Sequence, residues 1–303
     1  RIMPQETNLN AAPYFDDFDA QSNYYKVLFK PAYPVQAREL NNLQSILQDQ
    51  VENVGNHFFK EGAKVIPGQT SYLSSYYAVQ IEPEFTGLPV SLYLDQLVGK
   101  IVTGRTSGVT AKVVKYITDE ESERSNYTLY VDYIQSGADA NSTKEFFDNE
   151  ILTVNETISF SNTFISAGEG AIQTIADGAA QVGSAFGISS GVYFLRGYFV
   201  DVFDDTLILD QYSNTPSYRI GLYVKEELIS SESDRTLNDN AQGFSNFTAP
   251  GADRLKISAT LAKRDLQEFD DQNFVQIAEV RNGILRDLNK DPWNNVLRNE
   301  LAR

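Results

Sequence analysis

The stretch Val192-Tyr-Phe-Leu-Arg-Gly-Tyr-Phe-Val-Asp-Val-Phe203 carries the strongest strand signal of this 303-residue chain and predicts a pair of strands. Its β-branched and aromatic residues suit a pleated, half-buried surface. The polar segment 230–254, with a turn at Pro250-Gly251, predicts a loop. Four further strands are predicted around that loop: Thr206–Leu209, Tyr218–Glu226, Leu255–Ala262 and Phe274–Val280. We therefore expect a β-rich C-terminal part.

A second group of short strands is predicted upstream of this part. They are Val90–Leu94, Lys100–Thr103, Thr110–Ile117, Tyr127–Ile134 and Ile151–Phe160. Gly99, Gly104 and Gly108 separate the first of them at turn spacing, and residues 119–124 and 137–144 form polar loops. We interpret this block as a small β-barrel or sandwich inserted into the first domain.

The remaining segments complete the predicted organisation. Ala63–Gly68 and Tyr76–Ile81 predict strands, residues 166–191 are rich in Gly, Ala and Ser, and Pro292–Ala302 predicts a short terminal helix. The predicted fold is mainly β with a long N-terminal helix (α+β), with β-sandwich or barrel layers and a small inserted β domain. Three regions follow from this: an assembly region at 1–89, the inserted domain at 90–165, and a continuation of the first domain at 166–303.

The segment 34–54 contains the clearest helix signal of the chain. Pro34 suits the first helical position, and Gly55 lies where a glycine would end the helix. Five apolar residues three or four apart share one face, with Ile46 beside them: Leu40, Leu43, Leu47, Val51 and Val54. Read as heptads, the same seam includes Gln36 and Gln50. The face could pack on its own domain, or on symmetry mates or another subunit.

The composition of the chain argues against several classes of function. The formal net charge is −16, and no basic stripe is present beyond pairs such as Lys263–Arg264, so we expect no nucleic-acid binding. The absence of cysteine excludes disulfides, zinc–thiolate sites and cysteine nucleophiles. No apolar run approaches the roughly 18 residues of a membrane span, and the first residues lack a signal-peptide core. We expect no membrane insertion and synthesis in a bacterial cytoplasm.

Residues that could carry chemistry have simpler explanations. Asp16, Asp17 and Asp19 resemble half a calcium loop, but its glycine and final glutamate positions are Ser22 and Leu28. His57 is the chain's one histidine, and no Gly-x-Ser-x-Gly elbow accompanies it. Four aspartates near a predicted hairpin suit turns better than glycosidase chemistry: Asp201, Asp204, Asp205 and Asp210. Gly168-Glu-Gly170 and Gly178–Gly183 lack complete phosphate-loop motifs. We predict no enzyme activity, cofactor or metal site.

Aromatic residues gather before the helix. They lie in Pro13-Tyr-Phe-Asp-Asp-Phe-Asp19 and in Tyr24–Phe29, which predicts a short strand. Apolar and aromatic residues beside polar neighbours are typical of interfaces. The assembly interface is therefore expected to include Tyr14, Phe15, Phe18, Tyr24, Tyr25, Leu40, Leu43, Leu47 and Val51.

Several ordered blocks carry a family resemblance. They are Ala12–Asp19, Asn23–Pro31, Tyr33–Gln48 and Gly55–Gly62, with later blocks at Gly168–Gly178 and Gly191–Val200. This run resembles large virion structural proteins of tailed phages of cyanobacteria and other marine bacteria, described as tail, baseplate or tail-fibre proteins. Residues 95–160 resemble them only loosely. The chain has Ala32 where that family usually has glycine.

The resemblance implies a structural role in the virion. It implies a tail tip, baseplate or tail-fibre mount that mediates subunit assembly and fibre attachment. The implied partners are further copies of the chain in a homo-oligomer, such as a trimer, other tail proteins and the tail fibre. It also implies that the chain is the N-terminal portion of a longer polypeptide. The family supplies no catalytic residues.

Two other functions stay open at this point. The inserted domain could bind a host glycan through exposed aromatic residues, and Tyr127, Tyr130 and Tyr133 are candidates, although a core face also explains them. A tail-associated glycan hydrolase would need two carboxylates facing each other in a cleft. No part of the sequence specifies such a pair.

Overall fold

The structure is a computed structural model that describes residues 5–66, 69–118, 120–122, 126–137, 143–161 and 163–288. Two α-helices, of which one is long, three 3-10 helices and nineteen strands are assigned within these ranges. The fold is mainly β with one long N-terminal helix, as predicted. The helix predicted at Pro292–Ala302 and parts of the loops at 119–124 and 137–144 lie outside the described residues.

The largest sheet has eight antiparallel strands in the order β11-β8-β5-β6-β7-β2-β12-β15. In that order they are Gly170–Gln173, Ile151–Val154, Ile101–Gly104, Thr110–Ile117, Tyr127–Gln135, Thr70–Ile81, Ala180–Ile188 and Asp205–Asp210. One isolated bridge joins Ile81 to Thr174, so the curled sheet approaches its own strand β2 near β11. In the part of the chain that the structure describes, no ladder closes this sheet into a barrel.

Three smaller groups of strands complete the β structure. One three-stranded sheet has the order β1-β13-β14 (Ala63–Ile66, Gly191–Leu195, Tyr198–Val202). One four-stranded sheet has the order β17-β16-β18-β19 (Arg254–Asp265, Tyr218–Ile229, Phe274–Arg281, Ile284–Leu288). Two short ladders pair β3 (Glu84–Phe85) with β4 (Leu88–Pro89) and β9 (Ile158–Phe160) with β10 (Thr163–Ile165).

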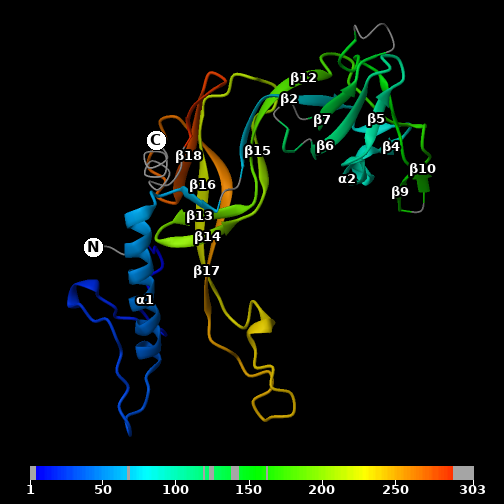
Figure 1. Cartoon of the computed structure of the whole chain (residues 1–303). Helices are drawn as coiled ribbons and strands as arrows, with labels where there is room; N and C mark the ends of the chain where they lie inside the picture. The colour runs from blue at the N-terminus through cyan, green and yellow to red at the C-terminus, as the bar shows by residue number, and fades with distance from the viewer. Residues whose placement is uncertain are drawn as a thin grey trace.

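Strands β2 and β12 connect two hydrophobic cores (Figure 1). Val79 and Ile81 of β2 belong to the first core, which lies within the sheet from β11 to β2. Phe186 and Ile188 of β12 belong to the second, which lies between β13, β14 and the four-stranded sheet. The division at residues 89 and 165 stays a prediction, although the first core reaches from Val79 to Ile172.

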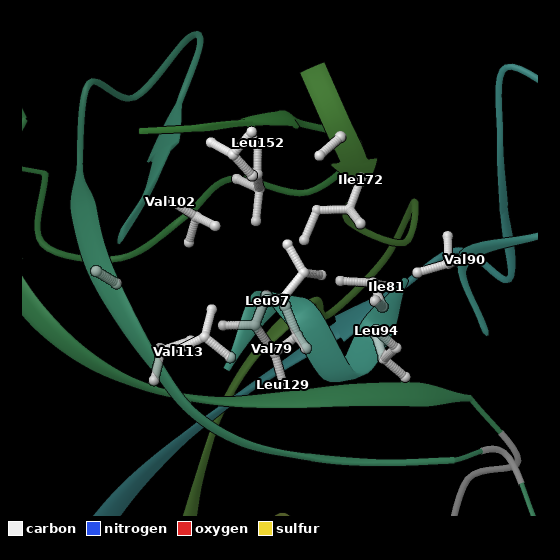
Figure 2. Packing of buried hydrophobic residues seen from close by; sticks show 14 of the residues in the cluster. Val79, Ile81, Val90, Leu94, Leu97, Val102, Val113, Leu129, Leu152 and Ile172 are labelled. Atoms are coloured by element: carbon white, nitrogen blue, oxygen red, sulfur yellow. The ribbon is translucent and has the colours of Figure 1, made fainter. Parts of the chain in front are cut away.

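The segment predicted as strand Val90–Leu94 is helical instead. A 3-10 helix at Val90–Leu92 leads into α2, Leu94–Leu97. Val90, Leu94 and Leu97 then point together into the first core, as Figure 2 shows. The spacing of these apolar residues suits a helical turn that covers the concave side of a curled sheet. A strand would have sent alternate residues into solvent.

Other strand boundaries also differ from the prediction. Ile151–Phe160 is two strands, β8 and β9, because the chain bends at Asn155, whose exposed side chain accepts a bond from the Ile101 amide at 3.0 Å. Tyr24–Phe29, predicted as a strand, pairs with no strand among the described residues. The Gly/Ala/Ser-rich stretch contains β11 and β12. In β12, Gly183 leaves room for the Gln211 carbonyl oxygen, which would lie 2.4 Å from a β-carbon at position 183. Small residues here permit close strand packing.

Candidate assembly interface

The long helix α1, Ala37–Phe58, directs its apolar stripe away from the rest of the chain. Leu47 and Val54 are 59% and 60% exposed, and Ile46 is the one large apolar residue of α1 that is buried. The exposed stripe, hereafter the outer stripe, consists of Leu40, Leu43, Leu47, Val51, Val54 and Phe58. The sequence left two packings open for this stripe, on the chain's own domain or on another subunit. In the structure the stripe does not pack in the chain's own core.

The opposite face of α1 is polar, and this is the face that meets the body of the molecule. Gln48 donates its side-chain amide to the Gly197 carbonyl at 2.9 Å. Asp49 and Glu52 are buried on the same side, and Asp49 accepts a bond from Asn53 at 2.8 Å. A usual amphipathic helix buries its apolar stripe. Helix α1 is therefore inverted, with its polar face toward the body and its apolar stripe toward solvent.

Gly55 explains how the polar face can approach so closely. It was predicted to end the helix, but the helix continues through it to Phe58, and a β-carbon at this position would lie 2.4 Å from Cε2 of Phe194. At the other end, the Gln36 amide donates to the Glu39 carboxylate at 2.9 Å, so the helix begins at Ala37 and not at Pro34. A first-turn carboxylate also complements the helix dipole.

A groove of about 880 Å³ separates the N-terminal half of α1 from strands β14 and β17. The helix contributes only polar side chains to it: Asn41, Gln44, Ser45 and Gln48. The C-terminal half of α1 contacts the sheets at Gly55 of the helix and at Gly197, which lies in the turn between β13 and β14. Figure 1 accordingly shows α1 at one side of the molecule.

Residues 20–36, hereafter the arm, extend beyond the N-terminal end of α1 and return to it (Figure 1). The arm exposes large apolar residues along its length: Tyr24, Tyr25, Leu28, Phe29, Tyr33 and Val35. It carries Lys26 and Lys30 and no acidic residue. Ala32 has φ +67°, a conformation that favours the glycine usual in the resembled family.

Asp16 fastens the base of the arm to α1. Its carboxylate is buried and accepts bonds from the Asn42 amide at 3.1 Å and from the Ser45 hydroxyl. Next to it, Asp17 pairs with Arg38 at 3.2 Å. Asp19 accepts a bond from the Gln21 amide and caps the 3-10 helix Ala20–Ser22. The aspartates that resemble half a calcium loop thus act as anchors and caps.

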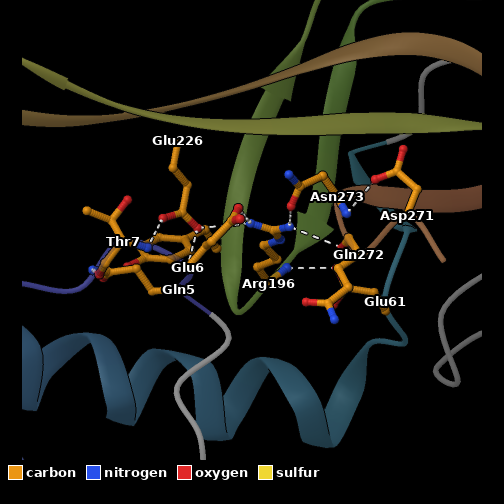
Figure 3. Close-up of polar contacts among 10 residues, drawn as sticks. Gln5, Glu6, Thr7, Glu61, Arg196, Glu226, Asp271, Gln272 and Asn273 are labelled. Carbon is orange, nitrogen blue, oxygen red and sulfur yellow. Dashed lines mark hydrogen bonds and ion pairs between the residues drawn. The ribbon is translucent and has the colours of Figure 1, made fainter.

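Arg196 forms bonds to several segments of the body beside α1 (Figure 3). It lies with φ +51° in the turn between β13 and β14, and its amide donates to the Glu61 carboxylate at 2.8 Å. Its guanidinium lies 3.2 Å from the carboxylates of Glu6 and Glu226 and donates to the Gln272 carbonyl at 3.1 Å. This clamp joins the N-terminal segment, β16 and the loop before β18.

The carboxylate of Glu226 is the buried centre of the clamp. Burial alone would raise its pKa, but bonds from the amides of Glu6 and Thr7, together with the Arg196 guanidinium, outweigh burial and lower the pKa. For Glu61, burial is the dominant cause and raises the pKa, against the bond from the Arg196 amide. Glu226 is thus held in its charged form.

The predicted interface residues fall into two groups. Leu40, Leu43, Leu47 and Val51 are exposed on α1, and Phe15, Tyr24 and Tyr25 are exposed on or before the arm. Phe18 is half-buried and lines a hollow of about 290 Å³ between the arm and α1. Tyr14 is half-buried, and its hydroxyl donates to Asp253 at 2.5 Å, which raises the pKa of Tyr14. The role of these residues as an interface stays a prediction.

Part of the exposed apolar surface, at the end of α1 and in the arm, could not be predicted from the sequence. Phe58 continues the spacing of the outer stripe four residues after Val54, and the expected helix end at Gly55 concealed it. Leu28, Tyr33 and Val35 of the arm gave no periodic signal, because residues 24–36 form neither helix nor strand.

The residues considered for chemistry are dispersed or serve turns. Asp204 accepts a bond from Ser190 at 3.2 Å, Asp205 from the Thr206 amide, and Asp210 from the Tyr218 hydroxyl at 2.9 Å. His57 is exposed in the last turn of α1, edge-on to the Phe58 ring. Within the described ranges no three His, Asp or Glu side chains are grouped as metal ligands. Nor does any helix in that part have the length and apolarity to cross a membrane.

The three tyrosines considered for glycan binding pack inward. Tyr130 is buried and stacks on Tyr76 at 4.7 Å between ring centroids, and Tyr133 contacts Tyr77 and Phe146. Tyr127 packs against the first core. They form no exposed aromatic platform. The basic residue Arg264 is likewise engaged, by Asp271 at 2.6 Å.

Comparison with known proteins gives one match. A family model described as a domain of unknown function (DUF4815) matches residues 12–112 and 133–303. No curated protein and no solved structure matches the chain. The family match covers α1 with its arm, the second core and most of the first core. Its gap, residues 113–132, spans the second part of β6 and the first part of β7.

Proposed function

The chain belongs to the DUF4815 family of unknown function, and we propose that it is a structural component of a phage virion, at the tail tip, baseplate or tail-fibre mount. The assignment to a tail draws on the resemblance of residues 12–68 and of the later blocks to tail proteins. What the molecule contributes independently is a surface suited to assembly.

The inverted helix α1 is the observation that carries the proposal. Six large apolar residues face solvent on an element whose polar side is fixed by Gly55, Gln48 and Glu52. A contiguous exposed apolar patch rimmed by polar residues marks a site of protein–protein interaction. Exposure on this scale is costly in an isolated molecule, so a partner that covers the stripe accounts for it.

The arm supports the same role. Its exposed aromatic residues suit the buried centre of an interface, where tyrosine and phenylalanine are enriched. Its base is fixed by Asp16, while its apolar side chains make little contact with the chain itself. We expect the outer stripe and the arm together to contact further copies, in a trimer by analogy with the resembled family, and neighbouring tail proteins including the fibre.

Two measurements on particles test the proposal. Antibodies against the chain should label the tails of purified particles in electron micrographs. A tagged Leu43→Asp/Leu47→Asp variant, supplied in trans, should be excluded from particles, whereas Phe164→Asp, which changes an exposed apolar residue on β10, should be incorporated. Recovery of the chain only in the soluble lysate, with none in particles, would reject the proposal.

A further inference from the structure

The outer stripe can be placed on a heptad pattern, with Val51 and Phe58 at position e. With Leu40 at position a, positions a hold Leu40, Leu47 and Val54, and positions d hold Gln36, Leu43, Gln50 and His57. The residues of α1 that face the rest of the chain lie at positions b, c and f and include Gln48, Asp49 and Gly55, whereas Arg38 and Asn56 near the two ends stay exposed. Positions a, d and e are exposed, although Gln44 borders the groove and Gln50 borders the hollow beside the arm, and a and d form the seam of a coiled coil.

The charge distribution on α1 favours copies of the same helix as the occupant. Rotational symmetry brings identical positions together, so a charge in the seam would repel its own copy. The chain has 41 acidic residues, yet none of the a, d and e positions from 36 to 58 is Asp, Glu, Lys or Arg. Glu39, Asp49 and Glu52 all lie at g, c or f. A foreign partner could instead place an opposite charge against a charged residue of the seam, which an identical copy in register cannot do.

Gln50 provides a reason for one register. A side-chain amide both donates and accepts, so Gln50 side chains from neighbouring copies satisfy one another in the same layer. Opposite an aliphatic layer the amide would be buried without a partner, which costs about 1–3 kcal/mol. A single polar layer of this kind fixes register in coiled coils.

The symmetry of the proposed trimer favours parallel packing. Copies related by a three-fold axis bring their α1 helices together in parallel, whereas an antiparallel pair needs a two-fold axis. Parallel packing in register covers every residue of the outer stripe. We infer that α1 packs against α1 of other copies of this chain, parallel and in register, with Gln50 facing Gln50. This inference rests on the proposed assembly role and names the partner.

The absence of cysteine from the chain permits a direct test. Single-cysteine variants of the full chain, Leu40→Cys and Val54→Cys, are oxidised and run on non-reducing gels. Parallel packing in register predicts that each variant cross-links to itself roughly ten-fold faster than its control, because a disulfide needs the two Cα atoms within about 7 Å. The controls are Arg38→Cys and Asn56→Cys, which are exposed near the two ends of α1 but outside the seam.

The outcomes separate this inference from the proposed function. Cross-linking at control rates in both seam variants would overturn the inference, as would cross-linking of Leu47→Cys alone, which an antiparallel pair centred on Leu47 predicts. If seam cross-links fail but Leu43→Asp/Leu47→Asp is still excluded from particles, α1 contacts another protein and the proposed function stands. If the cross-links form but particles lack the chain, the proposed function falls and the self-packing of α1 stands.

Discussion

Gly55 lies against the ring of Phe194 so closely that a β-carbon on residue 55 would stand 2.4 Å from Cε2. This contact fixes which side of α1 meets the body, and with it the outward direction of the stripe. Phe194 is fully buried and also contacts Phe59 and Phe199, so its ring has little freedom to move. The orientation of α1 therefore depends on a residue with no side chain.

Gly55→Ala should destabilise the chain despite the better helix propensity of alanine. Overpacking costs about 1–3 kcal/mol, against a propensity gain of about 1 kcal/mol. Urea denaturation of Gly55→Ala, Phe194→Leu and the double variant forms a double-mutant cycle. The smaller residue at 194 should relieve the clash, so the double variant should be more stable than the sum of the single effects predicts. Additive effects would show that the two residues are not coupled.

Arg196→Met should cost about 3–5 kcal/mol of folding stability, because it leaves the carboxylate of Glu226, which is 2% exposed, without its cation. The matched control is Arg281→Met, which removes the exposed pair with Glu279 and should cost less than about 1 kcal/mol. Adding Glu226→Gln to Arg196→Met should recover part of the loss. Equal losses in the two arginine variants would contradict the clamp.

The clamp also predicts a dependence of stability on pH. The folded-state pKa of Glu226 is lowered, so its contribution is complete above the unfolded pKa of about 4.3 and is lost as pH falls through the folded pKa. The stability difference between the natural chain and Glu226→Gln should be constant near neutral pH and should shrink in acid. Urea melts from pH 7 to pH 3 measure it. A difference that grows in acid would contradict the assigned direction.

Asp16→Ala should release the arm without unfolding the body. The buried carboxylate accepts bonds from Asn42 and Ser45 of α1, and these are lost together. Trypsin should then cut faster after Lys26, the arm's cleavable site because Pro31 follows Lys30, while the thermal midpoint changes little. Asp19→Ala, which removes only an exposed cap, should leave the cleavage rate near that of the natural chain. Equal cleavage rates in Asp16→Ala and Asp19→Ala would contradict the role of Asp16 as the anchor of the arm.

The sequence predicted most elements of the fold, and its errors have physical causes. The strands β13 and β14 appear where Val192–Phe203 indicated them, because alternating aromatic and β-branched residues have few alternatives to a sheet. Strand β12 escaped notice since its glycines serve close packing between β2 and β15, a tertiary requirement without a local signal. Val90–Leu94 has strand composition, but the shape of the first core selects a helix.

The candidate interface shows a similar division. The spacing of Leu40, Leu43 and Leu47 predicted the stripe itself. Its direction could not be predicted, because an apolar stripe on a helix usually faces the chain's own core. The polar inner face is compensated by distant residues such as Gly197 and Asp16, which the helix sequence does not reveal.

Sedimentation velocity of the isolated chain across a concentration series tests the outer stripe most directly. The natural chain and Phe164→Asp should associate to the same oligomer. Leu43→Asp/Leu47→Asp should remain monomeric with unchanged far-ultraviolet circular dichroism, because both leucines are exposed in the single molecule. A natural chain that stays monomeric at the highest concentration, or a double variant that associates as the natural chain does, would contradict the assignment of this face to assembly.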